Sequence, residues 1–223
     1  MAAHDARGAT APLTDHIGLE RLIFFSDAVF AIAITLLAIE IRLPAGEYGD
    51  NAALLNALIS LWPRYLSYGV SFLVIGSFWL AHHRMFRHIV RYDRRLLGLN
   101  LALLLGIAFV PFPTAVLGES DSVVATSFYA LTMAATGLLS AGLWWYASNR
   151  GRLLKAPMAP HALRASRWRA LTPPGVFLLS VPIAWWSSDL ARFSWLLIAV
   201  GLLVQAPGRD EALRGAGAPV AGD

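Results

Sequence analysis

The sequence predicts an all-α integral membrane protein with six transmembrane helices and both termini in the cytoplasm. Hydrophobic residues make up 57% of the 223 residues and charged residues only 14%, which is far from the composition of a soluble domain. Several apolar stretches approach the roughly 20 residues that a membrane-spanning helix needs. Basic residues gather in alternate connections between these stretches, as they do where cytoplasmic loops set the orientation.

The apolar stretches mark the expected spans. They cover residues of about 22–43, 61–83, 96–117, 122–147, 170–187 and 190–206. Between the first two, residues 45–60 hold Gly46 and Gly49 and then ALLNALIS, which predicts an extracellular turn that leads into a short helix or into the start of the second span. Residues 1–20 lack the apolar segment of a signal peptide, so we expect a disordered cytoplasmic tail there. The Gly, Ala and Pro of residues 207–223 predict a second such tail, which leaves 21–206 as the membrane domain.

Arginine residues predict the orientation. Two connections hold most of the basic residues, namely Arg84, Arg87, Arg91, Arg94 and Arg95 in one and Arg150, Arg152, Lys155, Arg164, Arg167 and Arg169 in the other. Both connections should therefore be cytoplasmic. An even number of spans then puts both termini on the same side.

The composition and the absence of known motifs argue against several kinds of chemistry. The chain has no cysteine, so it contains no disulfide, thiolate metal site or cysteine nucleophile. It also has no phosphate-binding glycine loop, hydrolase or zinc-protease motif, and no T-V-G-Y-G filter, so we predict no catalytic residues and no enzyme. The histidines lack the i, i+4 spacing of a helical metal site, and we expect no metal or other cofactor. The net charge of +4 comes from residues beside the spans, which argues against a nucleic-acid partner.

Asp27 is the most unusual residue of the first span. A carboxylate inside the membrane is costly and needs a partner. If neighbouring spans run antiparallel, Ser26 and Asp27 lie at the same depth as Trp79, as His82 or His83, and as Asn100. These side chains include acceptors, ring donors and an amide that can do both, so we expect one hydrogen-bonded layer.

The 3.6-residue helical period separates Asp27 from a second face of the same helix. With Ile32 at zero, Thr35 falls near −60° and Ile39 near −20°, whereas Asp27 falls near −140° and Ser26 near +120°, at about 100° per residue. Ile32, Thr35 and Ile39 thus share one stripe that points away from Asp27. Such a stripe is most often a helix-packing surface, a threonine in a membrane often bonds back to its own helix, and a buried Asp with a nearby His is either a helix-to-helix clamp or a proton relay.

The motifs around these residues resemble a known family. Arg21, Phe25, Ser26 and Asp27 form an R-x-x-x-F-S-D pattern, which is similar to that of prokaryotic members of the transmembrane protein 175 family, potassium-permeable channels related to the lysosomal channel of animals. The likeness continues through residues 78–86 and from residue 100 to residue 114. It covers the first three spans, while the last three match only in number, length and topology.

The resemblance implies a homotetramer in the lipid bilayer of the cell membrane that conducts potassium and other monovalent cations. The first helix of each subunit would line the pore, with apolar rings at Ile32 and Ile39 as the gate and Thr35 as a hydroxyl ring between them. Arg21, Phe25, Ser26 and Asp27 would hold the first helix against the next two, together with Trp79, His82 or His83, and Asn100. On the helical wheel, however, Arg21 lies near −20°, about 20° from Ile32, so it also fits the cytoplasmic mouth.

Two other functions stay open on the sequence alone. A proton-coupled carrier would use Asp27 and the nearby histidines as a relay. A membrane enzyme is a third hypothesis, and no motif supports it. The channel and the carrier differ in whether flux saturates and depends on a pH gradient.

Overall fold

The computed structural model describes residues 11–46, 48–149, 153–156 and 158–195, and its regular elements within these ranges are α-helices. The helices are α1 (Ala11–Ile39), α2 (Asn51–Ser60), α3 (Trp62–Phe86), α4 (Arg94–Phe109), α5 (Pro111–Glu119), α6 (Val123–Ser148) and α7 (Pro160–Trp186). Residues 188–195 are also helical.

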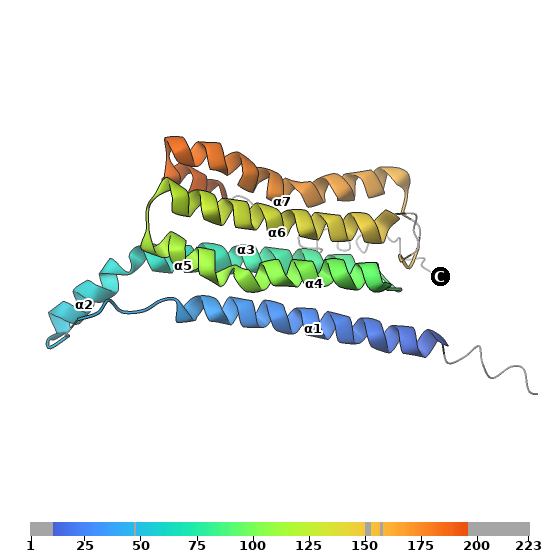
Figure 1. Ribbon diagram of the computed structural model, residues 1–223, viewed down its shortest axis with the longest axis horizontal. Helices are drawn as coiled ribbons and strands as arrows, with labels where there is room; N and C mark the ends of the chain where they lie inside the picture. Colours follow the sequence, from blue (N-terminus) through green and yellow to red (C-terminus); the bar gives the residue numbers. More distant parts are fainter. Residues whose placement is uncertain (1–10, 47, 150–152, 157, 196–223) are drawn as a thin grey trace, which may run out of the picture.

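The long helices run roughly along one axis and form layers (Figure 1). Helix α1 lies at one edge and packs on α3, α4 and α5, which form the middle of the bundle. Helices α6 and α7 pack against each other on the opposite side. Helix α2 projects beyond the bundle and has no buried residue. Helix α1 is thus held from one side only.

Four helical segments of the described chain are long and apolar enough to cross a membrane, namely His16–Ile39, Trp62–Phe86, Arg94–Glu119 and Val123–Ser148. The chain is therefore a multi-pass, all-helical membrane protein. The predicted fifth span, residues 170–187, lies within α7 except for its last residue, and the first half of this 27-residue helix carries several arginines. Most of the predicted sixth span, residues 190–206, lies outside the described residues.

Prolines and caps shift several predicted boundaries. The predicted third span is two helices, because Pro111 and Pro113 cannot donate the backbone hydrogen bonds that would continue α4 through this point. The first helix ends at Ile39 and not at residue 43. Of the two alternatives for the ALLNALIS stretch, the structure shows the separate short helix, α2, and not the start of the second span. The start of α2 is capped by the Asp50 carboxylate, which accepts from Ala53 N at 2.6 Å.

The expectation of a disordered tail over residues 1–20 is wrong for residues 11–20, which are the first turns of α1. Extending an existing helix adds one backbone hydrogen bond per residue without a new nucleation cost. Leu19 is buried. At Gly18, a Cβ would lie only 2.0 Å from the hydroxyl of Tyr92, so glycine is what lets this ring pack against the helix. Residues 1–10 and 207–223 lie outside the described residues.

The two arginine-rich connections pair with each other at the end where α1 begins. Ile89 and Leu154 form an isolated antiparallel bridge. Val90 N donates to Leu153 O at 2.9 Å, and Lys155 N donates to His88 O at 2.8 Å. The predicted cytoplasmic connections therefore lie at one end of the bundle and contact one another.

Candidate functional site on helix α1

Helix α1 has two unlike faces. One face is buried against the bundle and consists of Leu19, Leu22, Ser26, Phe30, Ala33 and Leu37. The other is exposed and mostly apolar, and includes Phe25, Ala28, Ala31, Ile32, Thr35, Leu36 and Ile39. Spacings of three and four residues along each set produce continuous stripes on opposite sides of the helix.

On the buried face, Ser26 joins a chain of hydrogen bonds that crosses three helices. His82 Nε2 lies 2.9 Å from Asn100 Oδ1. Asn100 Nδ2 donates to Ser26 Oγ at 2.9 Å, and Ser26 Oγ donates to the Leu22 carbonyl at 2.8 Å. Because an amide oxygen can only accept, His82 must carry its proton on Nε2 in this arrangement. The hydrogen bonds therefore run in one direction, from α3 through α4 to the backbone of α1.

The side chains of this hydrogen-bonded series are almost completely buried. Ser26 and Asn100 are fully buried, and His82 is 1% exposed. The His82 ring stacks on Phe86, with centroids 4.3 Å apart, and its other neighbour is Phe30 of α1 at 5.5 Å. A buried polar group without a partner is costly, so each of these side chains depends on the next one.

Asp27 makes a separate contact. Its Oδ1 accepts from Trp79 Nε1 at 2.9 Å, which connects α1 directly to α3. Asp27 is half-buried, and Trp79 is 36% exposed. The single polar layer expected from the sequence is thus two hydrogen-bonded groups, one fully enclosed around Asn100 and one at the rim of the α1–α3 contact.

The structure distinguishes the two histidines that the sequence left open. His82 joins the enclosed chain, whereas His83 is exposed and has its ring 5.7 Å from that of Trp79. Arg21 and Phe25 are not brought to either hydrogen-bonded group: Arg21 is exposed, and Phe25 is 52% exposed on the same side of α1 as Ile32. A role for these two residues in clamping α1 stays a prediction.

On the exposed face, Ile32 and Ile39 are 58% and 57% exposed, and Thr35 lies between them. The Thr35 hydroxyl donates to the Ile32 carbonyl at 2.8 Å. This hydrogen bond uses the only proton of the hydroxyl. The lone pairs of the oxygen therefore remain available to accept a hydrogen bond or to coordinate a cation outside the helix. The face therefore presents two branched apolar side chains and one oxygen acceptor.

The structure contains a second enclosed polar group that the sequence did not predict. Ser71 Oγ of α3 lies 3.0 Å from the Tyr129 hydroxyl of α6 and 2.8 Å from Thr114 Oγ1 of α5. Tyr129 also packs on Trp195, with ring centroids 4.8 Å apart. Single hydroxyl side chains are common in membrane helices, so nothing in the pattern marked these three as neighbours.

Known proteins resemble the chain over most of its length. A family model for the endosomal/lysosomal potassium channel TMEM175 (transmembrane protein 175) matches residues 21–111. A potassium channel of Streptomyces collinus is 40% identical over 181 residues, which are 79% of this chain and 87% of that protein. A potassium channel of Chamaesiphon minutus is 36% identical over 184 residues, which are 81% of this chain and 88% of that protein.

A solved structure resembles the fold as well. The crystal structure of a lysosomal potassium-selective channel TMEM175 homolog from Chamaesiphon minutus has a TM-score of 0.75 at 32% identity, and the likeness covers 86% of this chain and 99% of that one. The family that the motifs predicted is thereby confirmed. The chain belongs to the TMEM175 family, which is a family of ion channels and not of enzymes.

Proposed function

We propose that this chain is the subunit of a potassium-permeable cation channel of the cell membrane, assembled as a homotetramer with α1 of each copy around a central pore. The relatives from Streptomyces collinus and Chamaesiphon minutus are named potassium channels, and the similar solved structure is of a potassium-selective channel. Their high coverage of this chain supports carrying that activity over to it.

The observation that carries the proposal is that α1 has two different faces. One is hydrogen-bonded to neighbouring helices, which we call the fastened face, and the opposite one is exposed, which we call the bare face. Ser26 and Asp27 connect the helix to α3 and α4 by side-chain hydrogen bonds. The opposite stripe contains Ile32, Thr35 and Ile39, all of which are exposed in the single chain. A pore-lining helix needs this arrangement, because one side must be held firmly while the other meets the ion path.

In the proposed tetramer, Ile32 and Ile39 form two rings of four branched side chains. A narrow apolar ring is poorly wetted, so water and hydrated ions cross it only when it widens. Helix α1 rises about 1.5 Å per residue, which separates the two rings by roughly 10 Å along the axis. The constrictions thus act as a hydrophobic gate, and slight tilting of α1 opens or closes both.

Thr35 supplies the oxygen ligands of the proposed path. Four hydroxyl oxygens, each with its proton bonded to the Ile32 carbonyl, would face the axis between the two apolar rings. They replace part of the water shell of an ion that crosses the neck. Because there is no carbonyl-lined filter loop, selectivity should be modest and favour potassium, which loses water more easily than sodium.

The six-span topology with both termini in the cytoplasm completes the proposal. The four apolar helical segments account for the first four spans. Helix α7 and the helix that begins at residue 188 would supply the last two. The end where α1 and α4 begin carries the arginine-rich connections, which supports its assignment to the cytoplasmic side.

The carrier hypothesis gains little from the same contacts. A relay needs groups that both take up and release protons. The chain from His82 passes through the Asn100 amide, which does not exchange protons in this way, and ends at a backbone carbonyl of α1. Asp27 bonds to Trp79, whose indole is a donor only. These contacts support a fastening role for both groups.

Flux through the purified protein in liposomes tests the proposal. The channel predicts downhill potassium efflux that does not saturate, needs no pH gradient and exceeds sodium efflux, together with a protein mass of four chains in detergent. Saturable flux that requires a pH gradient and is lost in Asp27→Asn would establish the carrier instead. Absence of cation flux from folded protein would reject both.

A further inference from the structure

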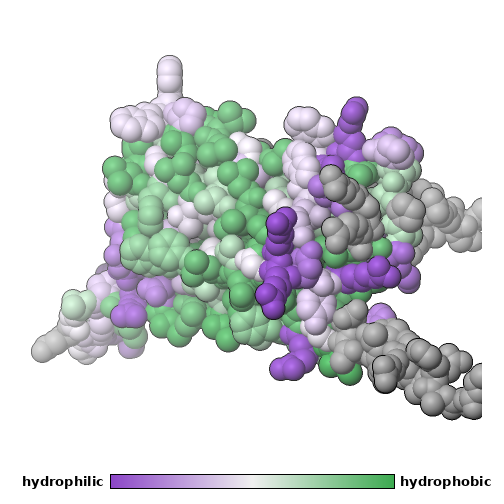
Figure 2. Space-filling view, turned by 45° about the vertical axis from the view of Figure 1, so that its right-hand side comes forward, coloured by the Kyte–Doolittle hydropathy of each residue, from purple (hydrophilic) through white to green (hydrophobic). Residues whose placement is uncertain are grey.

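At the end opposite the arginine-rich connections, the chain leaves the bundle just after α1. Leu37 is the last buried residue of this helix, and the described residues from 38 to 46 are exposed or half-buried. Helix α2, which follows, projects from the bundle and has no buried residue. Figure 2 shows hydrophilic side chains at this end, beside a broad apolar surface. Burial of apolar side chains therefore does not hold the chain beyond Leu37, where Ile39 lies.

Arg64 contacts this segment from another helix. Its Nη1 donates to the backbone carbonyl of Arg42 at 2.6 Å, which connects the first turn of α3 to the chain just after α1. Arg42 Nε in turn donates to the Ile39 carbonyl at 3.3 Å. This carbonyl belongs to the last turn of α1, where backbone carbonyls lack partners within the helix. Two hydrogen bonds thus lead from Arg64 through Arg42 to Ile39.

Helix α5 holds the Arg64 side chain. A Cβ at Gly118 would lie 3.2 Å from Arg64 Cγ and 3.3 Å from Arg64 Cα, so glycine is what lets α5 pack this closely on the arginine. Arg64 Nη2 also lies 3.6 Å from Glu119 Oε1. The helix dipole disfavours a cation in the first turn of a helix, so α3 alone gives no reason for an arginine at this position. The favourable contacts of Arg64 are those with α5 and with the segment after α1.

The two polar contacts of Arg64 differ in strength. The Glu119 side chain is 64% exposed, and an exposed ion pair at 3.6 Å contributes little to stability. The hydrogen bond to the Arg42 carbonyl is much shorter, at 2.6 Å, and its donor is charged, which strengthens it. The main polar interaction of Arg64 is therefore with the segment that follows α1.

We propose that Arg64 is a positioning residue for the outer ring of the gate, because it fixes the end of α1 that presents Ile39. This inference rests on the proposed pore, in which four Ile39 side chains form that ring. Arg64 acts from outside the ion path, through the backbone of residues 39–42. Without it, the last turn of α1 is free to move away from α3 and α5, and the ring widens. Since wetting of an apolar neck depends on its width, ion flux should then rise.

Potassium flux in liposomes and amide hydrogen exchange test this inference on the assembled full chain. Arg64→Gln removes the hydrogen bond to the Arg42 carbonyl together with the ion pair, whereas Glu119→Gln removes the ion pair alone. We expect Arg64→Gln to raise potassium flux roughly threefold, which is within the range of one lost hydrogen bond. Amide exchange of peptides that cover residues 36–46 should be at least about twofold faster. Glu119→Gln should stay close to the parent chain in both measurements.

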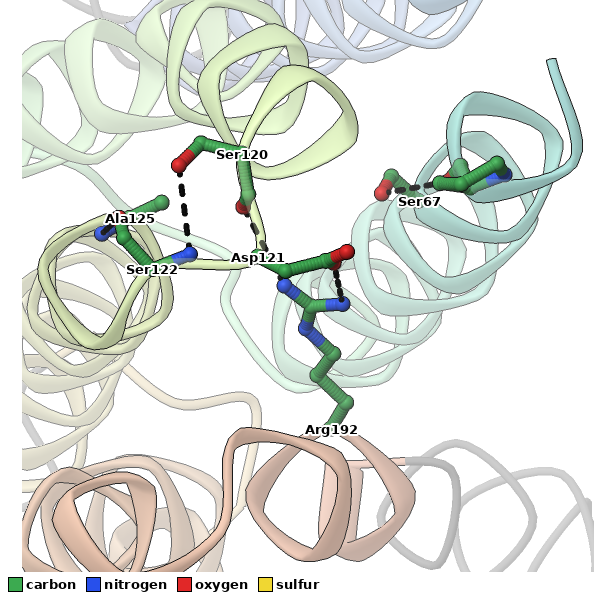
Figure 3. Close-up of polar contacts among 7 residues, drawn as sticks. Ser67, Ser120, Asp121, Ser122, Ala125 and Arg192 are labelled. Carbon is green, nitrogen blue, oxygen red and sulfur yellow. Dashed lines mark hydrogen bonds and ion pairs between the residues drawn. The ribbon is translucent and has the colours of Figure 1, made fainter. Parts of the chain in front are cut away.

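Arg192→Gln is the matched control, because it removes an equal charge at the same end of the bundle. Arg192 Nη1 lies 2.8 Å from Asp121 Oδ1, and its Nη2 donates to the Ser120 carbonyl at 3.4 Å. Figure 3 shows the Arg192 guanidinium reaching this connection between α5 and α6. Flux and exchange over residues 36–46 should equal those of the parent chain. An increase as large as that in Arg64→Gln would show that charge at this end has the effect, and would overturn the inference.

A double variant tests whether Arg64 acts through the ring. In Ile39→Asn the ring already admits water, so Arg64→Gln should add no further flux in that background. Arg64→Lys keeps a charged donor and should lie closer to the parent chain than Arg64→Gln does. A threefold increase that persists in the Ile39→Asn background would overturn the role in positioning the ring.

Hydrogen exchange separates this inference from the proposed function. Absence of cation flux from the parent chain would reject the channel, and exchange over residues 36–46 would then decide whether Arg64 fixes the end of α1. Unchanged exchange in Arg64→Gln would overturn that role even if the parent chain conducts potassium. If Arg64→Gln does not assemble, Arg42→Ala decides, because it removes only the exposed donor to the Ile39 carbonyl. It should also raise flux and exchange, and unchanged values would overturn the inference.

Discussion

The two faces of α1, a helix of 29 residues, differ in their contacts: one is hydrogen-bonded to neighbouring helices and the other is exposed. On one face, Ser26 and Asp27 are matched by Asn100 and Trp79 of neighbouring helices. On the other, Ile32 and Ile39 are bare in the single chain. The polar side chains that are most unusual in this sequence have hydrogen-bond partners within the chain. The face that we propose meets the ion is mostly apolar. In this helix, the carboxylate of Asp27 lies on the side that is hydrogen-bonded to the bundle, and not on the face that we propose lines the pore.

This comparison predicts that changes on the fastened face alter stability, whereas changes on the bare face alter conduction. The largest effect on stability should come from Asn100→Ala, because it removes the acceptor of His82 and the donor to Ser26 at once. We expect a loss on the order of 2 kcal/mol in unfolding free energy, since two buried groups lose their partner. Thermal unfolding and the yield of assembled protein measure it.

Asn56→Ala is the matched control for Asn100→Ala, since Asn56 is exposed on α2. Its melting temperature should equal that of the parent chain. If Asn100→Ala assembled normally but changed the ratio of potassium to sodium flux, the assignment of this face to anchoring would be wrong.

Ile39→Asn should change conduction most. An amide in the apolar ring lets water into the neck, so we expect potassium flux to rise roughly tenfold, which corresponds to about 1.4 kcal/mol off the barrier. Liposome flux assays measure it. Leu105→Asn places the same side chain at an exposed position of α4, and it should leave flux unchanged. Equal increases in both variants would show that the effect is not specific to α1.

Thr35→Ala should have a smaller effect, confined to selectivity. Loss of the hydroxyl oxygen removes a ligand of hydrogen-bond strength, about 0.5–1.5 kcal/mol, so the permeability ratio of potassium to sodium should fall roughly twofold to tenfold. Reversal potentials with potassium on one side and sodium on the other measure the ratio. Thr35→Ser keeps the oxygen and should preserve it; a ratio unchanged in Thr35→Ala would remove the hydroxyl ring from the mechanism.

Trp79→Phe and Asp27→Asn should have the smallest effects of the series, and Trp79→Phe the larger of the two. It deletes the indole donor to Asp27 but keeps an aromatic ring, and the pair lies at the rim of the helix contact. We expect a stability loss below about 1 kcal/mol by thermal unfolding. Asp27→Asn keeps the accepting oxygen and should be closer still to the parent chain. A loss in Trp79→Phe larger than that in Asn100→Ala would reverse the ranking of the two hydrogen-bonded groups.

The sequence predicted the two faces of α1 because helical periodicity and the expense of polar groups in lipid both act locally. It could not separate His82 from His83, since adjacent residues differ by about 100° and only the partner helix shows which one points inward. The prediction of one polar layer was wrong for the same reason. The sequence indicates which residues lie at similar positions along neighbouring helices, but not how α3 and α4 are rotated about their axes.

Helix boundaries depended on features beyond hydropathy. The break before Pro111 has a visible cause in the sequence, yet proline within a membrane helix is tolerated often enough that the break did not follow from it. Helix α1 starts ten residues earlier than expected because Leu19 and Gly18 find partners in the bundle, and Tyr92 of a distant loop is one of them. Such contacts between distant segments have no local signal.

Cysteine accessibility tests most directly whether the bare face of α1 lines the pore, and the natural chain has no cysteine to interfere. Thr35→Cys and Ile39→Cys would be compared with Leu105→Cys, which is exposed on α4, during treatment with a charged, water-soluble thiol reagent in liposomes. The reagent should block potassium flux in the two α1 variants and not in Leu105→Cys. Flux that persists in both α1 variants after treatment, or is blocked equally in Leu105→Cys, would contradict the pore-lining role of this face.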